Sequence, residues 1–597
     1  MPPTSKRWDI APPVPHRQLD RLSHIHSLIV QILYNRGVTD PVEVDAFLNG
    51  RPLFNDPFRM LGMPQAVERI RHAIRMGELI VVYGDFDADG VTATALLVQA
   101  LRAFGAQVTP YIPHRVDEGY GLNCDALDRI AGWGARLVIT VDCGIRSPIE
   151  VARGNAIGLD MIVTDHHSIF RDEADVEHLP PALAVINPKR QGDPYPFKDL
   201  AGVGIAFKLA QALLIAEKRE PVGETPDDAE RLDIEPPPLE ERDLLDLVAL
   251  GTVADLAPLL GENRFLVQRG LAELKRPRRA GLQAMMEEAR LNPTKVDATA
   301  IGFVLGPRLN AAGRLTTADT SYRLLTAPDP LTARPLAEEL GRLNLERQRL
   351  TQEMVAKAKA QIAASPSAGY VFLVSDESFN PGVVGLVAGR LTEEFYRPAL
   401  VAHAGPEEAH GSARSVAEFN ITAALDQCRD LLRRYGGHAA AAGFTVANEN
   451  ISLLQARLEE IAARELGGQE LAPSLSVDAV VSLSDIDWAL QGLLSQVEPC
   501  GYGNPQPVLA TAGLEVASPP RIVGQDGQHL KLSVRDPNGT GPNARRVVDA
   551  IAFRLGAWAG QLPRRIDLAY TVEINEYNGE KRLQLNVKDI RPAAEKR

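Results

Sequence analysis

The chain has few of the features that mark secreted, membrane-spanning or disulfide-rich proteins. Only four of its 597 residues are cysteine, and the wide spacing of Cys124, Cys143, Cys428 and Cys500 fits neither a disulfide framework nor a zinc knuckle. No run of eighteen apolar residues occurs, and prolines and charged residues follow Met1 where a signal peptide would be apolar. We therefore expect a cytoplasmic protein without a membrane span.

Aromatic residues and excess positive charge are scarce as well. Aromatics make up 5% of the chain and the formal net charge is −13, which by itself argues against a nucleic-acid partner, because phosphate binding depends on clustered Lys and Arg. The charge is uneven, however: Gly261–Leu315 contains ten basic and five acidic residues, whereas Pro226–Asp246 is rich in Asp and Glu. A solvated face is the ordinary interpretation of such runs, so net charge does not decide the question.

Acidic residues and histidines follow three predicted strands where each strand ends. The strands Leu79–Tyr83, Arg136–Val141 and Met161–Thr164 are followed by Asp85–Gly90, Asp142 and Asp165–His167, respectively. Alternating strands and helices from Leu79 to Pro188 predict βαβ units and a mainly parallel sheet. Because the carboxyl ends of such strands line one crevice, we expect these side chains to meet in space.

The spacing of these residues favours a site for divalent cations. Asp87 and Asp89 are one residue apart, and closely packed carboxylates repel one another unless cations lie among them. Oxygen ligands with one imidazole suit manganese or magnesium better than zinc. Asp142 could bridge two ions, and His166 could complete the second with Asp89 and Asp255. A pair of such ions catalyses phosphoester hydrolysis in many enzymes. The alternative is that the acidic residues form a solvated loop, which is the more common role of a single acidic cluster.

The motifs resemble the DHH phosphoesterase superfamily, and their extent singles out the RecJ family of single-strand-specific exonucleases. The matching segments are Val82–Gly90, Tyr111–Arg115, Glu118–Gly121, Val141–Gly144, Asp165–His167, Gly251–Asp255, Gly306–Arg314, Gly382–Gly385, Gly411–Ser415, Gly436–Ala439 and Gly501–Pro507. They extend from Leu79 to the C-terminal region. The chain departs from the pattern at Tyr83, where many relatives place a histidine ligand, and at Asn380, where relatives often have histidine.

The resemblance implies a role for each matching polar residue. It implies that Asp87, Asp89, Asp142, His166 and Asp255 bind two Mn²⁺ or Mg²⁺ ions. His167 would act as an acid-base partner at the scissile phosphate, with Asp85 supporting the catalytic centre; for His167 alone, a core or supporting histidine is the alternative. For substrate binding, Arg115, Ser412 and Arg414 would hold a terminal 5′-phosphate, and Arg308, Asn310, Arg314 and His438 internal phosphates or bases. A surface salt bridge is the alternative for each arginine.

The resemblance and the element pattern together predict an α/β protein of five segments. These are an α-helical N-terminal extension of the catalytic domain (1–75), a parallel-sheet DHH catalytic domain (76–330), a long connecting helix (331–365), a smaller α/β DHHA1 substrate-binding domain (366–468), and an OB-fold-like β-barrel that binds nucleic acid (469–597). A structural barrel is the alternative for the last segment. Helices are expected at Val91–Phe104, Leu239–Leu250, Leu336–Ile362 and Ile421–Tyr435, and an exposed loop at Glu220–Pro238.

The function that the resemblance implies is a single-stranded-DNA-specific exonuclease of DNA repair and recombination. Its 5′-to-3′ polarity and release of 5′-mononucleotides come from the resemblance alone, as do a monomeric state and partnership with single-strand-binding protein and a helicase. One alternative is a DHH phosphoesterase for short oligonucleotides, cyclic dinucleotides or pyrophosphate. Another is a catalytically inactive DHH scaffold in replication, which the retention of all five ligands argues against.

Overall fold

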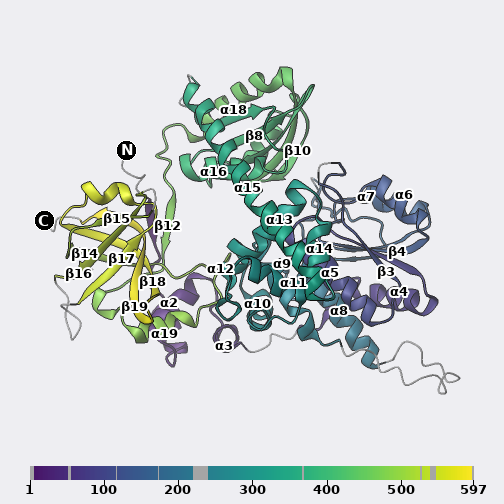
Figure 1. Cartoon of the computed structure of the whole chain (residues 1–597), viewed down its shortest axis with the longest axis horizontal. Helices are drawn as coiled ribbons and strands as arrows, with labels where there is room; N and C mark the ends of the chain where they lie inside the picture. The colour runs from purple at the N-terminus through teal and green to yellow at the C-terminus, as the bar shows by residue number, and fades with distance from the viewer. Residues whose placement is uncertain are drawn as a thin grey trace. The chain divides into compact units, whose positions relative to one another are not determined.

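The computed structural model describes residues 6–50, 55–115, 117–172, 174–219, 239–365, 369–524, 527–537 and 546–593 (Figure 1). The chain forms two compact units, one of Met1–Arg51 with Gly468–Arg597 and the other of Pro52–Gly467. Residues up to Arg51, expected as an extension of the catalytic domain, thus belong with the C-terminal segment. The predicted loop Glu220–Pro238 lies outside the described residues.

The second unit begins with the predicted parallel sheet, which the structure confirms. Five strands lie in the order β3-β2-β4-β5-β6, and every neighbouring pair is parallel. Their bounds are Leu79–Tyr83 (β2), Val108–Tyr111 (β3), Ala135–Val141 (β4), Asp160–Thr164 (β5) and Ala184–Ile186 (β6). The order reverses at β2, so the carboxyl ends of β2 and β4 flank a crevice of the kind in which α/β proteins bind ligands.

Each face of this sheet has its own apolar core. Ile80 and Val82 of β2 pack with helices α4 (Met63–Met76), α5 (Ala88–Ala103) and α8 (Gly202–Arg219). Val81 and Tyr83 pack on the opposite face with α6 (Cys124–Gly132) and α7 (Pro148–Ala156). Successive strand residues point to opposite faces, so both cores require the near-continuous apolar runs of the sequence.

Two helices of this domain begin or end differently from the prediction. Helix α5 begins at Ala88 because the carboxylate of Asp87 caps it, accepting hydrogen bonds from the backbone N–H groups of Asp89 and Gly90. Helix α9 (Leu245–Ala254) continues beyond the predicted end at Leu250. Gly251, in the added turn of α9, allows α9 to approach α5 closely. A Cβ at this position would lie only 2.7 Å from Asp89 Oδ1 on α5, so only glycine fits there.

The connecting helix α15 (Pro330–Ala364) leads to the smaller α/β domain. Its 35 residues start six residues before the predicted helix at Leu336, because Asp329 caps the helix through the N–H of Thr332. Strands β7 (Phe372–Asp376), β8 (Ala399–Ala404), β9 (Glu408–Arg414), β10 (Leu432–His438) and β11 (Ala441–Ala447) form a sheet in the order β10-β11-β9-β8-β7, with helices α16 (Val384–Phe395), α17 (Ile421–Asp426) and α18 (Ile451–Leu466).

The prediction of one helix over Ile421–Tyr435 is wrong. Helix α17 ends at Asp426, and the residues from Leu432 onward form strand β10, paired antiparallel with β11. As an edge strand, β10 exposes most residues on both faces and therefore lacks the alternation by which strands are recognised. Gly437, with a φ of 157°, lies so close to Ala442 that a Cβ would be 2.5 Å from its Cα.

The first unit contains the expected small β-domain. Its sheet has the order β13-β14-β18-β19-β17-β16-β15, and β14 also pairs with β16, so the sheet curls back on itself. The bounds are Ala479–Val480 (β13), Leu509–Val516 (β14), Arg521–Val523 (β15), His529–Arg535 (β16), Val547–Ala552 (β17), Arg565–Tyr577 (β18) and Glu580–Pro592 (β19). Asn578 and Gly579 have positive φ and form the hairpin turn between β18 and β19.

The N-terminal segment is tied to this domain by strand pairing and by one arginine. Strand β1 (Arg7–Ile10) pairs in parallel with β12 (Ser474–Val477), and helices α1 (His16–Arg21), α2 (Ser27–Asn35) and α3 (Pro41–Asn49) follow β1. The buried guanidinium of Arg36 donates to Asn504 Oδ1, to Asp478 Oδ1 and to the carbonyl of Pro505. The Gly501–Pro507 motif therefore anchors the N-terminal helices.

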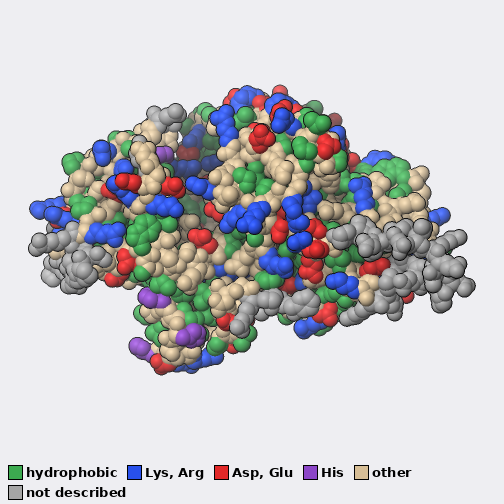
Figure 2. All heavy atoms as spheres, turned by 60° about the horizontal axis from the view of Figure 1, so that its bottom comes forward, with side chains coloured by type: hydrophobic (Ala, Val, Ile, Leu, Met, Phe, Trp, Pro, Cys, Tyr) green, Lys and Arg blue, Asp and Glu red, His purple; other side chains and the backbone are tan. Residues whose placement is uncertain are grey.

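Two surface properties bear on function. Among the residues that the structure describes, no helix is both long and apolar enough to cross a membrane. Lys and Arg side chains are interspersed with Asp and Glu over the face shown in Figure 2, so on this face the net charge of −13 is not gathered into one acidic surface.

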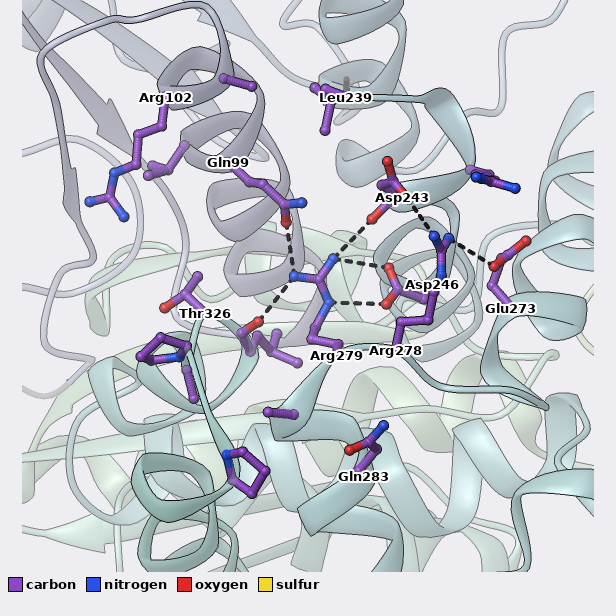
Figure 3. Close-up of a pocket in the computed structure, with 18 residues that line it drawn as sticks. Gln99, Arg102, Leu239, Asp243, Asp246, Glu273, Arg278, Arg279, Gln283 and Thr326 are labelled. Atoms are coloured by element: carbon purple, nitrogen blue, oxygen red, sulfur yellow. Dashed lines mark hydrogen bonds and ion pairs between the residues drawn. The ribbon is translucent and has the colours of Figure 1, made fainter. Parts of the chain in front are cut away.

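A partly buried arginine joins several helices of the second unit. Arg279 lines a cavity of about 680 Å³ and forms two hydrogen bonds with the carboxylate of Asp246, at 3.0 and 3.2 Å (Figure 3). It also donates to Gln99 on α5 and to the carbonyls of Asp243 and Leu325. This side chain therefore links α5, α9 and α14 (Asp319–Leu325).

We expect Arg279→Ala to lower the free energy of unfolding by about 3 kcal/mol, because it leaves the Asp246 carboxylate buried without its partner. Arg349→Ala, which removes an exposed pair with Glu346, is the matched control and should cost less than about 1 kcal/mol. Urea denaturation followed by circular dichroism measures both. Equal shifts in the two variants would contradict a bridging role for Arg279.

Candidate metal centre

The loop after β2 brings Asp85 and Asp87 to the carboxyl end of the sheet. Gly90 makes this tight loop possible, because a Cβ there would lie 2.6 Å from the backbone N and O of Asp85. Asp87 Oδ1 accepts from the N–H groups of Asp89 at 3.0 Å and Gly90 at 3.1 Å. The first turn of α5 therefore fixes the carboxylate of Asp87 and leaves its second oxygen available.

Asp89 and Asp142 are held by the N-terminal turn of α8. The two carboxylate oxygens of Asp89 accept from the N–H groups of Gly202 at 2.7 Å and Val203 at 2.8 Å. Asp142, directly after β4, has a φ of 62°, which is unfavourable for a residue with a side chain. Gly202 lies against it, since a Cβ at Gly202 would be 2.6 Å from Asp142 Cβ.

The possible ligand atoms form three overlapping groups. In each group the nitrogen or oxygen atoms lie within 4.8 Å of one another, and the groups are Asp85, Asp87 and Asp142; Asp89, His166 and Asp255; and Asp142, His166 and His167. His166 Nε2 is 3.1 Å from Asp142 Oδ1 and 3.7 Å from Asp255 Oδ2. The first two groups suit two separate cations, and Asp142 lies within reach of both.

Within the described part of the chain, three buried atoms among these ligands have no hydrogen-bond partner: Asp85 Oδ1, Asp142 Oδ1 and His166 Nε2. Burying such atoms without a partner is costly, and a divalent cation would satisfy all three. Burial also lowers the pKa of His166 to about 3, which keeps the imidazole neutral, as metal coordination requires. The donor set therefore fits Mn²⁺ or Mg²⁺.

The carboxylates of this acidic cluster (Asp85, Asp87, Asp89, Asp142 and Asp255) repel one another. Burial and the neighbouring Asp87 carboxylate raise the pKa of Asp89 to about 7. Burial and the carboxylates of Asp89 and Asp87 raise the pKa of Asp255 to about 9. The same two causes raise the pKa of Asp85 and of Asp142 well above the ordinary range. The site therefore favours bound positive charge.

His167 is oriented by Asp165. Its Nδ1 lies 2.7 Å from Asp165 Oδ1, which also accepts from the backbone N–H of His167, while Asp165 Oδ2 accepts from the N–H of Ile145. Burial would raise the pKa of Asp165, but the hydrogen bond with His167 lowers it to about 2. Burial would lower the pKa of His167, but the bond with Asp165 raises it. Asp165 therefore fixes the orientation of the His167 ring beside the cluster.

A cleft of about 770 Å³ runs from His167 to the smaller domain. Its lining includes Tyr120 and Arg146 from the sheet loops, and Arg434 and His438 from β10. Burial, together with the charges of Arg146, His167 and Lys189, lowers the pKa of His438. Both α/β domains of the second unit thus contribute polar and basic groups to one cleft beside the acidic cluster.

Arg115, Arg314 and Arg414 form an arginine group on the side of Asp85 and Asp87. The guanidinium of Arg115 lies over the ring of Phe86, 3.9 Å from its centroid. Arg414 donates to Ser412 Oγ and to the carbonyl of Ala413, both at 2.8 Å. Burial lowers the pKa of Arg314 to about 10, and the charges of Arg115 and Arg414 act in the same direction. The predicted residues Arg115, Arg314, Ser412 and Arg414 are thus brought together.

Two of the predicted substrate-binding residues make other contacts. Arg308 pairs with Glu288, with Nε 2.7 Å from Oε2, and donates to the carbonyl of Val304. Asn310 Oδ1 accepts from the backbone N–H of Ala88 at 2.8 Å, so it supports the first turn of α5. These contacts account for the positions of both side chains without a bound phosphate.

The structure also accounts for the two departures from the family pattern. Tyr83 points into the opposite core, where its hydroxyl donates to the carbonyl of Gly121 at 3.0 Å and its ring stacks on Tyr111. Asn380 Oδ1 accepts from the N–H of Gly382, which shapes the turn into α16. Neither side chain contributes to the ligand groups described above.

Sequence reasoning missed the residues that support the His166-His167 segment. Lys189 Nζ donates to the carbonyl of His166 at 2.6 Å, and Asn187 Nδ2 donates to the carbonyl of His167 at 3.0 Å. Both follow β6 directly, so their position at a strand end was the available signal. Asp165, which orients His167, stood in the recognised motif but had no role assigned to it.

The parallel sheet, the ligand groups at its strand ends and the facing smaller domain define a protein of the DHH class. Three family models match in chain order: the DHH family N-terminal domain at residues 79–252, the DHHA1 domain at 367–464 and the RecJ OB domain at 477–589. These matches support the predicted order of domains.

The chain belongs to the RecJ family. It is 38% identical to the single-stranded-DNA-specific exonuclease RecJ of Bacillus subtilis, covering 98% of this chain and 70% of that protein. It is 36% identical to the RecJ of Escherichia coli, covering 96% and 97%. Among solved structures, RecJ of Thermus thermophilus in complex with Mn²⁺ matches with a TM-score of 0.80 and 31% identity, covering 98% of this chain and 80% of that chain.

The raised pKa values predict how the stability of metal-free protein depends on pH. Because the folded state holds protons on Asp89 and Asp255 that the unfolded chain has released, stability should fall as pH rises from 4 to 7, by about 1.4 kcal/mol per pH unit for each excess proton. Added Mn²⁺ should weaken this dependence. Thermal unfolding with EDTA or with Mn²⁺ measures it, and equal slopes in the two conditions would contradict the site.

Proposed function

We propose that this chain is a metal-dependent exonuclease that hydrolyses single-stranded DNA in the 5′-to-3′ direction, releases 5′-mononucleotides, and acts in DNA repair and recombination. The acidic cluster at the strand ends, in a chain of the RecJ family, is the observation that carries the proposal. The names of the curated relatives and the Mn²⁺ and Mg²⁺ complexes of the Thermus protein support it.

Two Mn²⁺ or Mg²⁺ ions are the proposed cofactors. Asp87, Asp89, Asp142, His166 and Asp255 would hold them, and the contact group of Asp85 with Asp87 and Asp142 favours Asp85 as a further ligand. Bound ions of this kind activate a water molecule and neutralise charge on the phosphate.

His167 is the proposed catalytic residue of the protein itself. Its bond to Asp165 fixes the ring and, against the opposing effect of burial, raises its pKa, which favours the protonated imidazole. A protonated imidazole in this position donates a hydrogen bond to a phosphate oxygen, or a proton to the leaving oxygen.

The arginine group is the proposed site for the terminal 5′-phosphate. Arg115 and Arg414 are both substantially buried, and burial lowers the pKa of each. A phosphate between them would offset the mutual repulsion of the guanidinium groups and accept bidentate hydrogen bonds, with Ser412 as a further donor. His438, Arg146 and Arg434 in the cleft would contact the following nucleotides.

Two features favour a long single strand over a small phosphoester. The cleft leads away from the acidic cluster along the smaller domain, and the chain carries a RecJ OB domain at residues 477–589, a fold that commonly binds single strands. A comparison of cleavage rates for a dinucleotide and a long strand separates the two activities.

We further propose that the enzyme acts as a monomer in the cytoplasm, on strands that a helicase supplies and single-strand-binding protein covers. The family resemblance supports these partners. The four cysteines, all within the described residues, form no disulfide with one another, which supports a reducing compartment.

Asp142→Ala should reduce the cleavage rate of a 5′-phosphorylated single strand in Mn²⁺ by about a thousandfold, because it removes the carboxylate shared by both ligand groups. Asp125→Ala, which alters an exposed aspartate on α6, is the control and should retain activity. Release of mononucleotides from an end-labelled strand measures both. Full activity in Asp142→Ala would refute the proposed centre.

Arg414→Ala should slow cleavage of a 5′-phosphorylated strand about tenfold or more while affecting a 5′-hydroxyl strand less, because a hydrogen bond to a charged phosphate is lost. Arg342→Ala, an exposed arginine paired with Glu339, is the matched control. Competition between the two strands in one reaction measures the preference. An unchanged preference would remove the arginine group from the 5′-phosphate site.

A further inference from the structure

A π-helical turn, η4 (Ile301–Leu305), interrupts the helices between α12 (Ala298–Ala300) and α13 (Gly306–Leu315). The N–H of Gly306 donates to the carbonyl of Ile301, five residues back. Pro307 explains the wider turn, because it has no N–H to donate to the carbonyl of Phe303, as an α-helix would require. Single π turns inside helices are frequent at functional sites.

The turn presents an aromatic side chain to solvent. Phe303 is 81% exposed, and a Cβ built at the neighbouring Gly302 would meet no atom within 4 Å. The wide turn therefore leaves the ring of Phe303 largely uncovered by the described residues. An exposed phenylalanine gains nothing for folding at such a position.

A second exposed apolar residue lies at the end of α9. Leu256 is 66% exposed and has a φ of 61°, a conformation unfavourable for a branched side chain. It follows Asp255, whose carboxylate belongs to the acidic cluster. A strained and exposed leucine next to the proposed metal ligand Asp255 suggests that its position serves to bind the substrate.

The turn and the end of α9 are neighbours. A Cβ at Gly306 would lie 3.3 Å from Ala254 Cβ, so the end of η4 packs against the last turn of α9. Arg308 fixes the turn from within, because it donates to the carbonyl of Val304 while pairing with Glu288. Phe303 and Leu256 therefore belong to two packed segments, and α9, the second of these, is followed directly by Asp255.

We propose that Phe303 and Leu256 form a platform beside the acidic cluster on which a nucleobase of the single strand stacks. The inference rests on the proposed function, since it assigns a contact to the single strand that the acidic cluster would hydrolyse. The arginine group supplies charged contacts for the backbone, whereas this platform supplies an apolar contact for a base. Every base has a π-face, so the contact is independent of sequence.

Kinetics with a long strand in Mn²⁺ tests the platform. We expect Phe303→Ala to raise KM about tenfold with a smaller change in kcat, because a stacking contact to the strand is lost. Phe303→Tyr retains a ring and should restore KM. Leu331→Ala, which removes an 88% exposed leucine at the start of α15, is the control and should leave KM unchanged.

A fluorescent base identifies the contact directly. Strands carrying 2-aminopurine at successive positions from the 5′ end should show quenching at one position on binding to Asp142→Asn, and Phe303→Ala should abolish that quenching. A wild-type KM for Phe303→Ala, or no position whose quenching depends on Phe303, would overturn the platform. Failure of the wild-type protein to degrade the strand would instead refute the proposed function.

Discussion

Repulsion among buried carboxylates is the constraint on which the functional part of this molecule depends. Asp85, Asp89, Asp142 and Asp255 all have raised pKa values because burial and neighbouring carboxylates oppose their ionisation. Such a cluster persists only because the surrounding backbone holds it. Glycines at positions 90, 202 and 251 permit approaches that a Cβ would prevent, and the first turn of α8 donates two N–H groups to one carboxylate.

The remaining features of the site follow from this concentration of negative charge. Cations between the carboxylates would convert it into a site that attracts phosphate, and the neighbouring groups have the properties that a strand requires. His167 is oriented by Asp165, the arginine group concentrates positive charge, and the cleft extends from His167 along β10. The net charge of −13 is therefore compatible with a nucleic-acid substrate, since the contacts depend on local rather than net charge.

The sheet and the acidic cluster could be predicted because buried parallel strands give continuous apolar runs and the polar residues follow each run directly. Strand alternation also predicts that Tyr83, in phase with Val81, points away from the cluster. The partners of Arg308 and Asn310 could not be predicted, because sequence does not tell whether a polar group faces a ligand or a neighbouring segment. Edge strand β10 and the pairing of β1 with β12 could not be predicted either, because both depend on contacts between residues distant in the sequence.

Anomalous diffraction from crystals of this protein soaked in Mn²⁺ tests the central claim most directly. Our account predicts two manganese peaks, one among Asp85, Asp87 and Asp142 and the other among Asp89, His166 and Asp255, with Asp142 contacting both. A single peak, or manganese bound only outside the acidic cluster, would contradict it.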